Sequence, residues 1–313
     1  MALFFKKSSH QENRIENAGR WPLRLTVFHL VDDYEFPPSQ FIETFYVREG
    51  NFLHETDAGT QALRKGAVIV NHPSNRHTIK QPEHVRIVRL RFLPEWLARD
   101  YDTILESPDV LSLFFAQSWF DIPSETTLNV FTTREAMQPF VEMEFDLLQQ
   151  NLATGRQTES ITRIGLLKLM LMLGDEYSVY WRGANRIEIP SQVRQAFDMI
   201  EKAVLSGDSL RLKDLEPAVG VSQDHLGRLF RKATGVTLVD YAQLRRIHHA
   251  ALRLLTTDIM AKDISEALGF TDSAHFSKSF QKYFGVSPNV YRQKFGPPEA
   301  APEPPEKAPD QQG

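Results

Sequence analysis

The sequence predicts a multidomain chain: an N-terminal antiparallel β domain with a helical extension, then a C-terminal all-helical domain. Three observations predict this. Short β-branched and aromatic runs end near residue 94, and helix-like apolar periodicity follows them. A segment of about 50 residues occurs twice near the C-terminus. The length of 313 residues also suits two domains better than one.

Composition excludes several classes of protein. The sequence contains no cysteine, so disulfides, thiolate catalysis and cysteine-ligated zinc are excluded, and a reducing cytoplasm is compatible with the chain. No stretch approaches the roughly 18 consecutive apolar residues of a membrane span. Lys6 and Lys7 follow a short apolar patch, which is the reverse of a secretory signal. We therefore expect a cytoplasmic protein without a membrane segment.

The charge of the chain is unevenly distributed. The formal net charge is −4 overall. Residues 190–296 carry fifteen Lys and Arg against eleven Asp and Glu, a net of +4, so the remainder carries −8. This asymmetry agrees with a basic nucleic-acid-binding part joined to an acidic sensor or partner part, and a solvated mixed-charge surface also produces such numbers.

The N-terminal part reads as strands. Residues 1–20 are polar and lack periodicity, which predicts a disordered leader. Within residues 21–94, the runs 23–27 and 85–92 alternate apolar and polar residues as half-buried strands do, and turn residues rich in Pro and Gly separate the runs. Strands at this spacing predict an antiparallel sandwich or barrel.

Residues 95–185 are predicted to form a helical extension. Ile161, Ile164, Leu167 and Leu171 fall on one stripe of a long expected helix whose other sides are also apolar. Such a helix has to be covered. Its own domain and a second copy of the chain are equally compatible covers, and in the second case these four residues form a dimer seam.

Residues 190–296 are predicted to form an all-helical domain with an internal repeat, and the Pro-rich acidic residues 297–313 a disordered tail. We call the copy around Ser222 the first unit and the copy around Asp272 the second unit. The matched pairs are Ser222 and Asp272, Leu226 and Phe276, Arg228 and Lys278, Phe230 and Phe280, Lys232 and Lys282, Gly235 and Gly285, and Val236 and Val286.

Each unit is predicted to contain a helix, a tight turn and a second helix. Gly220 and Gly269 supply the left-handed cap that ends the first helices, and Ser222 and Asp272 are good N-caps for the second ones. The outward faces of the second helices are polar and partly basic, as a helix in the DNA major groove requires. The predicted DNA-facing residues are Ser222, Gln223, Asp224, His225, Gly227, Arg228, Arg231, Lys232, Thr271, Ser273, Ala274, His275, Ser277, Lys278 and Gln281. An all-helical interaction domain with merely solvated faces is the alternative, which the tandem arrangement makes less favourable.

The same residues carry a family resemblance. The stretch that contains Leu229-Phe230-Arg-Lys, Ile264-Ser-Glu-Ala-Leu-Gly-Phe and Gly285-Val-Ser-Pro resembles the DNA-binding domain of the AraC/XylS transcription regulators, over about a third of the chain. The resemblance implies an activator more than a repressor. It also implies double-stranded DNA, RNA polymerase, a small-molecule effector and a second copy of the chain as partners. The base-facing positions that it implies are Asp224, Gly227 and Arg228 in the first unit, and Ser273, Ala274, His275, Ser277 and Lys278 in the second.

The first unit departs from the family pattern. Glu216 stands where a small residue usually lets the two helices approach, and Pro217 follows within the same predicted helix. Gly227 removes a side chain from a reading position, whereas Ser265 is a milder departure in the second unit. We therefore expect the second unit to be the more regular one.

The strand-rich part resembles the cupin-like effector domains that precede this DNA-binding module. Pro38, Ser39 and Gln40 lie where metal-binding cupins carry paired histidines, so neither a metal nor another cofactor is expected. The candidate effector-binding residues are Trp21, Arg24, Glu43, Tyr46, His72, Arg76 and His77, and sugars or organic acids suit their aromatic and guanidinium groups. His72 and His77 line a pocket or satisfy turn hydrogen bonds, two readings of equal weight.

Two rival functions remain at this point. One is a cupin-type metal enzyme, such as a dioxygenase or isomerase, with an appended helical domain; the missing ligands argue against it. The other is a constitutive DNA binder whose β domain only dimerises. The leading hypothesis is a ligand-responsive transcription regulator that is not an enzyme.

Overall fold

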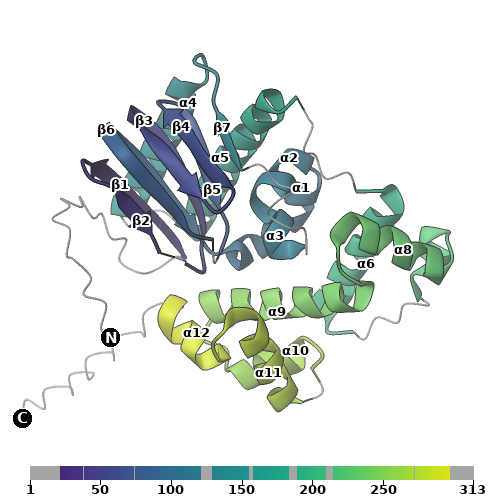
Figure 1. Ribbon diagram of the computed structural model, residues 1–313. Helices are drawn as coiled ribbons and strands as arrows, with labels where there is room; N and C mark the ends of the chain where they lie inside the picture. The colour runs from purple at the N-terminus through teal and green to yellow at the C-terminus, as the bar shows by residue number, and fades with distance from the viewer. Residues whose placement is uncertain are drawn as a thin grey trace, which may run out of the picture.

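The chain folds into a β-sheet region and a helical region that meet along one long helix. The computed structural model describes residues 22–37, 39–73, 75–120, 129–154, 158–182, 189–208, 214–270 and 272–296. In Figure 1 the helix α9 (Leu238–Thr256) runs below the sheet, with α6 and α8 at one end and α10, α11 and α12 beneath the other. The predicted leader and tail lie outside the described residues.

The N-terminal region contains a seven-stranded antiparallel sheet, as the alternation of residues predicts. Its strands are β1 (Leu23–Leu30), β2 (Tyr34–Phe36), β3 (Ile42–Thr56), β4 (Gly59–Arg64), β5 (Ala67–Asn71), β6 (His77–Phe92) and β7 (Val130–Thr132). The order is β1-β6-β3-β5-β7, with β2 paired to β6 and β4 paired to β3. The end strands β1 and β7 are not paired with each other among the described residues, so the sheet is not the closed barrel expected from the cupin resemblance.

The two longest strands bend where their pairing is irregular. The register between β3 and β6 shifts at three steps between Val47 and Leu53. Gly50 lies in this stretch with φ of +82°, and a Cβ atom there would lie 2.4 Å from the Glu83 carbonyl oxygen. Only glycine fits such a close approach of two backbones, and the extra local twist curves the sheet. The curvature gives the sheet a concave face.

The two faces of the sheet bury different cores. Phe28, Phe36, Phe45, Ile69 and Ile87 belong to a smaller cluster on the concave face. The opposite face contributes to a larger cluster that continues through the N-terminal helices into the C-terminal region. Since alternate residues of each strand serve the two clusters, both faces of the central strands are buried.

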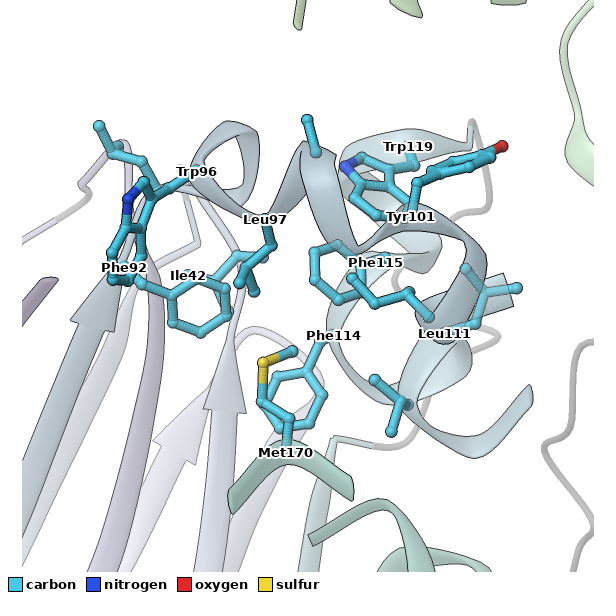
Figure 2. Packing of buried hydrophobic residues seen from close by; sticks show 14 of the residues in the cluster. Ile42, Phe92, Trp96, Leu97, Tyr101, Leu111, Phe114, Phe115, Trp119 and Met170 are labelled. Carbon is cyan, nitrogen blue, oxygen red and sulfur yellow. The ribbon is translucent and has the colours of Figure 1, made fainter. Parts of the chain in front are cut away.

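A helical segment and two long helices cover the second face. They are η1 (Pro94–Asp100), α1 (Tyr101–Leu105), α2 (Pro108–Val110), the π-helical η2 (Leu111–Phe115), α3 (Ala116–Trp119), α4 (Gln138–Thr154) and α5 (Glu159–Tyr180). Figure 2 shows Ile42 and Phe92 of the sheet near Trp96 and Leu97 of η1, with Phe114 of η2 next to Met170 of α5. Large aromatic side chains thus fill the space between sheet and helices.

The C-terminal region is all helical, as predicted. Its helices are α6 (Ser191–Ser206), α7 (Glu216–Val219), α8 (Gln223–Thr234), α9, α10 (Ala261–Ala267), α11 (Ser273–Phe284) and α12 (Pro288–Phe295). None of the helices in the described part of the chain has the length and apolar character that a membrane crossing requires.

One stretch that the sequence predicts as helical is partly a strand. Residues 130–132 form β7, which pairs with β5, and α4 begins only at Gln138. Three β-branched or aromatic residues beside an unpaired sheet edge gain more from ladder hydrogen bonds than from extending a helix. The helical extension therefore contributes a strand to the sheet.

Candidate functional site

The second helices of the two units are matched in length and position. Both α8 and α11 have 12 residues and start 50 residues apart. Ser222 Oγ accepts a hydrogen bond from the His225 backbone N–H at 3.4 Å, and Asp272 Oδ1 accepts one from the Ala274 N–H at 2.9 Å. Both helices end at a glycine with a left-handed backbone. The predicted N-caps Ser222 and Asp272 are confirmed.

The buried faces of these helices are also matched. Leu226 and Phe230 are at most 1% exposed in α8, and Phe276 and Phe280 are at most 1% exposed in α11. These positions fall at i and i+4, so they lie one above the other on the face that packs inward. Burial of one face fixes which residues point to solvent.

The opposite faces carry the predicted DNA-facing residues. The exposed ones are Ser222, Gln223, Asp224, His225, Arg228, Arg231, Lys232, Ser273, Ala274, His275, Lys278 and Gln281. Gly227 and Ser277 are half-buried, and Thr271 lies outside the described residues. Among these exposed predicted residues, three on α8 and one on α11 are lysine or arginine, and they are placed to meet phosphates or base edges.

The tight turn of the second unit is under close steric control. Gly269 has φ of +74°, and a Cβ atom there would lie 2.5 Å from the Gly207 carbonyl oxygen. Gly220 in the first unit has φ of +73° but open space around its Cα. The second unit therefore touches the segment after α6 directly, backbone against backbone.

Glu216 and Pro217 do not disturb the first unit in the way that the sequence predicts. Pro217 lies in the first turn of α7, where its missing N–H has no intrahelical acceptor in any case, and Glu216 is exposed. Neither residue lies inside a longer described helix or between the two helices of the unit. Proline instead sets the start of a short helix. In the second unit the buried Ser265 hydroxyl is satisfied by the Lys262 carbonyl oxygen at 2.7 Å.

The helix α9 joins the units. It runs from Leu238 to Thr256, directly after the first unit and before α10 of the second. Its 19 residues span about 28 Å at 1.5 Å per residue, and neighbouring major grooves on one face of DNA lie about 34 Å apart. Modest DNA bending makes up such a difference.

The concave face of the sheet carries a second group of polar residues. The Arg89 guanidinium bonds the Glu43 carboxylate, and both side chains are buried. The guanidinium carbon lies 5.1 Å from the ring centre of Phe36, 5.7 Å from that of Phe45 and 5.8 Å from that of Phe28. A buried cation held by three rings and one carboxylate is costly to assemble for stability alone.

Two histidines adjoin this group. His54 Nε2 lies 3.1 Å from His77 Nδ1, and the His77 ring stacks on Phe36 at 4.8 Å. Burial lowers the pKa of His54 to about 4 and, together with the charges of His54 and Arg89, that of His77 to about 3. Both imidazoles are therefore neutral near pH 7, and one donates to the other. His54 Nδ1 and His77 Nε2 have no partner among the described residues, which leaves one donor and one acceptor.

The predicted effector-binding residues do not all lie in one site. Glu43 and His77 belong to the concave-face group. Tyr46 packs on the opposite face, where its hydroxyl bonds Glu142 and its ring stacks on Phe145. His72 is buried beside Leu113, and burial lowers its pKa to about 4. Arg24 is half-buried on β1, Arg76 is exposed, and Trp21 lies outside the described residues.

The sequence reasoning missed His54 and Arg89. Arg89 shares the strand parity of Val85 and Ile87, so a charged residue occupies an apolar stripe, and that signal was available. His54 follows the bulge in β3, which obscures its parity. Among the described residues, no group of three or more His, Asp or Glu side chains is arranged to hold a metal ion.

The expected dimer seam is largely uncovered. Ile161, Ile164 and Leu171 of α5 are 48%, 60% and 38% exposed, whereas Leu167 is half-buried. On the neighbouring α4, Phe140, Met143 and Leu147 are also exposed, at i, i+3 and i+7. Residues at these spacings share one helix face, so the two helices present apolar stripes.

Comparison with known proteins finds a domain model, curated relatives and solved structures that match parts of this chain. A helix-turn-helix domain model matches residues 217–294. The transcriptional activator AarP of Providencia stuartii is 40% identical over 83 residues, 26% of this chain and 62% of AarP. The transposon Tn10 TetD protein of Escherichia coli is 32% identical over 124 residues, 38% of this chain and 90% of TetD. A solved AraC-type regulator structure from Chromobacterium violaceum is 27% identical and covers 34% of this chain and 95% of its own, with a TM-score of 0.32.

The chain spans less than two thirds of the length of the first curated relatives that it matches. The match to TetD nevertheless extends over nearly all of that relative. Together with the repeated capped helices described above, it shows that this chain belongs to the AraC/XylS family of transcription regulators.

Proposed function

We propose that this chain is a sequence-specific DNA-binding transcription regulator that presents α8 and α11 to neighbouring major grooves. One observation carries the proposal: two capped helices 50 residues apart bury equivalent faces and expose equivalent polar ones. Cations at the exposed positions bind phosphates, and Asp224, His275 and Ser273 have the donors and acceptors that base edges require. Since DNA is the partner, we place the protein in the cytoplasm.

The N-terminal region is proposed to bind a small-molecule effector on the concave face of a cupin-like sheet, within residues 21–94. Arg89, the His54–His77 pair and three phenylalanine rings suit a sugar or an organic acid, because these ligands combine hydroxyl or carboxylate groups with an apolar surface. AarP is named an activator, so we propose activation, through RNA polymerase, as the output.

Residues 95–185 are proposed to pair two copies of the chain. The stripes of α4 and α5 are self-complementary in character, since each offers apolar side chains over several turns. Homodimers most often use one such surface twice across a two-fold axis. Residues 190–296 then form the DNA-binding domain of each copy.

Gel-shift titration with the neighbouring promoter DNA tests DNA binding. Arg228→Ala and Lys278→Ala should each weaken binding and lower the slope of log affinity against log salt by about 0.9 per lost phosphate contact. Lys202→Ala, an exposed cation on α6, is the matched control and should leave both quantities unchanged. Equal affinities for all four proteins would show that α8 and α11 do not face DNA.

Two further measurements test the other parts. Sedimentation of Ile164→Glu should show a monomer, whereas Val31→Glu, at an exposed apolar residue of the sheet region, should remain a dimer. A thermal-shift screen with sugars and with aromatic or organic acids should find a ligand that stabilises the chain. His77→Phe should abolish that shift, and the exposed Arg76→Ala should not. A ligand that stabilises His77→Phe equally places the effector elsewhere.

A further inference from the structure

We propose that the N-terminal region supplies positioning residues to the DNA-binding units: Tyr101 and Trp119 for the first unit, and Glu95 for the second. These residues touch no DNA. They contact α6, α9 and α12, the helices against which α8 and α11 pack, and so set the angle between the two units. The inference goes beyond the proposed function, because it assigns part of the operator-spacing preference to residues outside the DNA-binding domain.

The contact to the first unit is centred on Arg245 of α9. Its guanidinium is fully buried and bonds both carboxylate oxygens of Glu201 on α6, each at 2.9 Å. On its other side the guanidinium carbon lies 4.0 Å from the ring centre of Tyr101 and 5.1 Å from that of Trp119. These two rings lie side by side in the N-terminal helical segment (Figure 2). Arg245 is thus held between the two regions of the chain.

This contact has a permanent charge. Burial by itself would raise the pKa of Glu201, but Arg245 and His249 lower it to about 2. Arginine stays protonated at every accessible pH. A buried, desolvated cation over two aromatic faces gains more than an exposed one, so removal of a ring costs the contact directly.

Aromatic packing extends the contact to α8. Phe120 stacks on Phe197 of α6 at 5.7 Å and on Tyr241 of α9 at 6.1 Å. Phe197 and Tyr241 in turn contact Phe230 of α8, at 5.2 and 5.3 Å. The core beneath α8 is therefore continuous with the N-terminal region.

The contact to the second unit is made to α12 and to the end of α11. The Tyr291 hydroxyl of α12 donates to Glu95 Oε2 at 3.3 Å, and both side chains are buried. Gln40 Nε2 donates to the Phe284 carbonyl oxygen at 2.9 Å, and Phe41 packs edge-on against Phe295 at 5.8 Å. Phe284 ends α11, so this contact reaches the second DNA-facing helix itself.

Both contacts join the C-terminal region to the N-terminal region, and α9 lies below the sheet in Figure 1. One contact is centred on Arg245 of α9, and the other reaches α12 and the end of α11. The second unit also touches the backbone at the end of α6, because Gly269 lies against Gly207, and α6 in turn packs on the first unit through Phe197 and Phe230. By itself, this backbone contact, which we call the pivot, would let the two units rotate relative to each other. The contact at Arg245 and the contact at Glu95, which we call the two clamps, fix the angle between the units. Release of either clamp should therefore free rotation about the pivot.

Distance measurement between spin labels tests this without an operator. The sequence contains no cysteine, so Lys232→Cys on α8 and Lys282→Cys on α11, both exposed, provide the only labelling sites. We expect one narrow distance distribution in this background. Tyr101→Leu, which keeps apolar volume, and Tyr291→Phe, which removes only the hydroxyl, should each broaden or shift it, and together should do so further.

A second label pair separates positioning from folding. Lys262→Cys with Lys282→Cys reports within the second unit and should give the same distribution in every variant. If Tyr101→Leu disturbs this pair as well, Trp119→Phe, which keeps a ring, takes its place. A between-unit distribution that stays unchanged in Tyr291→Phe and in the usable ring variant overturns the proposal, whatever their melting temperatures.

Discussion

The two helix-turn-helix units share an outward design and differ in what supports them. The second unit completes its core with its own neighbour, since Phe280 packs on Phe276, Phe284 and Tyr291 at 4.6 to 5.7 Å. The first unit completes its core with Phe197 and Tyr241, which themselves pack on rings of the N-terminal region. A repeated unit can therefore keep its exposed face while its buried face is adapted to different surroundings.

The largest expected effect comes from removing the central ring of each unit. Phe280→Ala and Phe230→Ala should each lower the free energy of unfolding by about 3–5 kcal/mol, since both side chains are fully buried. The difference lies in where protection is lost. In hydrogen exchange, Phe280→Ala should affect residues 261–295 and, through Tyr291, the surroundings of Glu95, whereas Phe230→Ala should loosen residues 101–120. Equal spread in the two variants would contradict the separate support of the units.

The pKa of Glu95, which contacts the second unit, gives the two units a different expected dependence on pH. Burial raises the pKa of Glu95 to about 7, so the folded chain binds a proton more tightly than the unfolded chain does. Stability from this group is present below the ordinary pKa and falls as pH rises through about 7. Glu95→Gln should therefore stabilise the protein by about 3 kcal/mol at pH 8 and by little at pH 4.5.

Denaturant unfolding at both pH values measures this effect, with the exposed Glu216→Gln as the control. Ionised Glu95 still accepts from the Tyr291 hydroxyl, so the loss of stability comes from desolvation of the buried carboxylate and not from loss of this hydrogen bond. A stability gain that is the same at pH 4.5 and pH 8 would refute the raised pKa.

Replacement of the turn glycines Gly269 and Gly220 by alanine should destabilise the protein to different extents. Gly269→Ala forces a side chain into the left-handed region and against the Gly207 carbonyl oxygen, and should destabilise the protein by about 2–3 kcal/mol. Gly220→Ala meets only the backbone penalty of about 1 kcal/mol, because nothing lies within 4 Å. Melting curves of the two variants measure the difference, and equal losses would show that the Gly207 contact is unimportant.

The smallest expected effect is a gain in stability from replacing Gly227. Gly227 lies inside α8, has ordinary helical backbone and has open space around it, so Gly227→Ala should stabilise the protein by about 0.5–1 kcal/mol. The second unit has no equivalent substitution, because Ser277 stands at the position that matches Gly227. A loss of stability in thermal unfolding would mean that Gly227 faces an unrecognised neighbour.

The C-terminal half was predictable because its signals are local. Caps at Ser222 and Asp272 and turn glycines at Gly220 and Gly269 depend on neighbours a few residues away, and the repeat supplied each signal a second time. Pro217 was misplaced within its helix, because the sequence alone does not show that a helix starts at the residue before it.

The N-terminal half was less predictable because its contacts are long-range. Arg89 meets Glu43 across 46 residues of sequence, and Tyr291 meets Glu95 across 196. Pairing of β7 with β5 likewise depends on an edge that only the folded sheet provides. Alternation identified strands, but the bulges between Val47 and Leu53 hid which face each side chain takes.

Selection of DNA from a random pool is the most direct test of the account. The wild-type chain should enrich two sequence blocks about one helical turn apart, one for each unit. Arg228→Ala should relax one block, and Lys278→Ala the other. A single block, or two blocks that neither substitution alters, would contradict the claim that α8 and α11 each lie in a major groove.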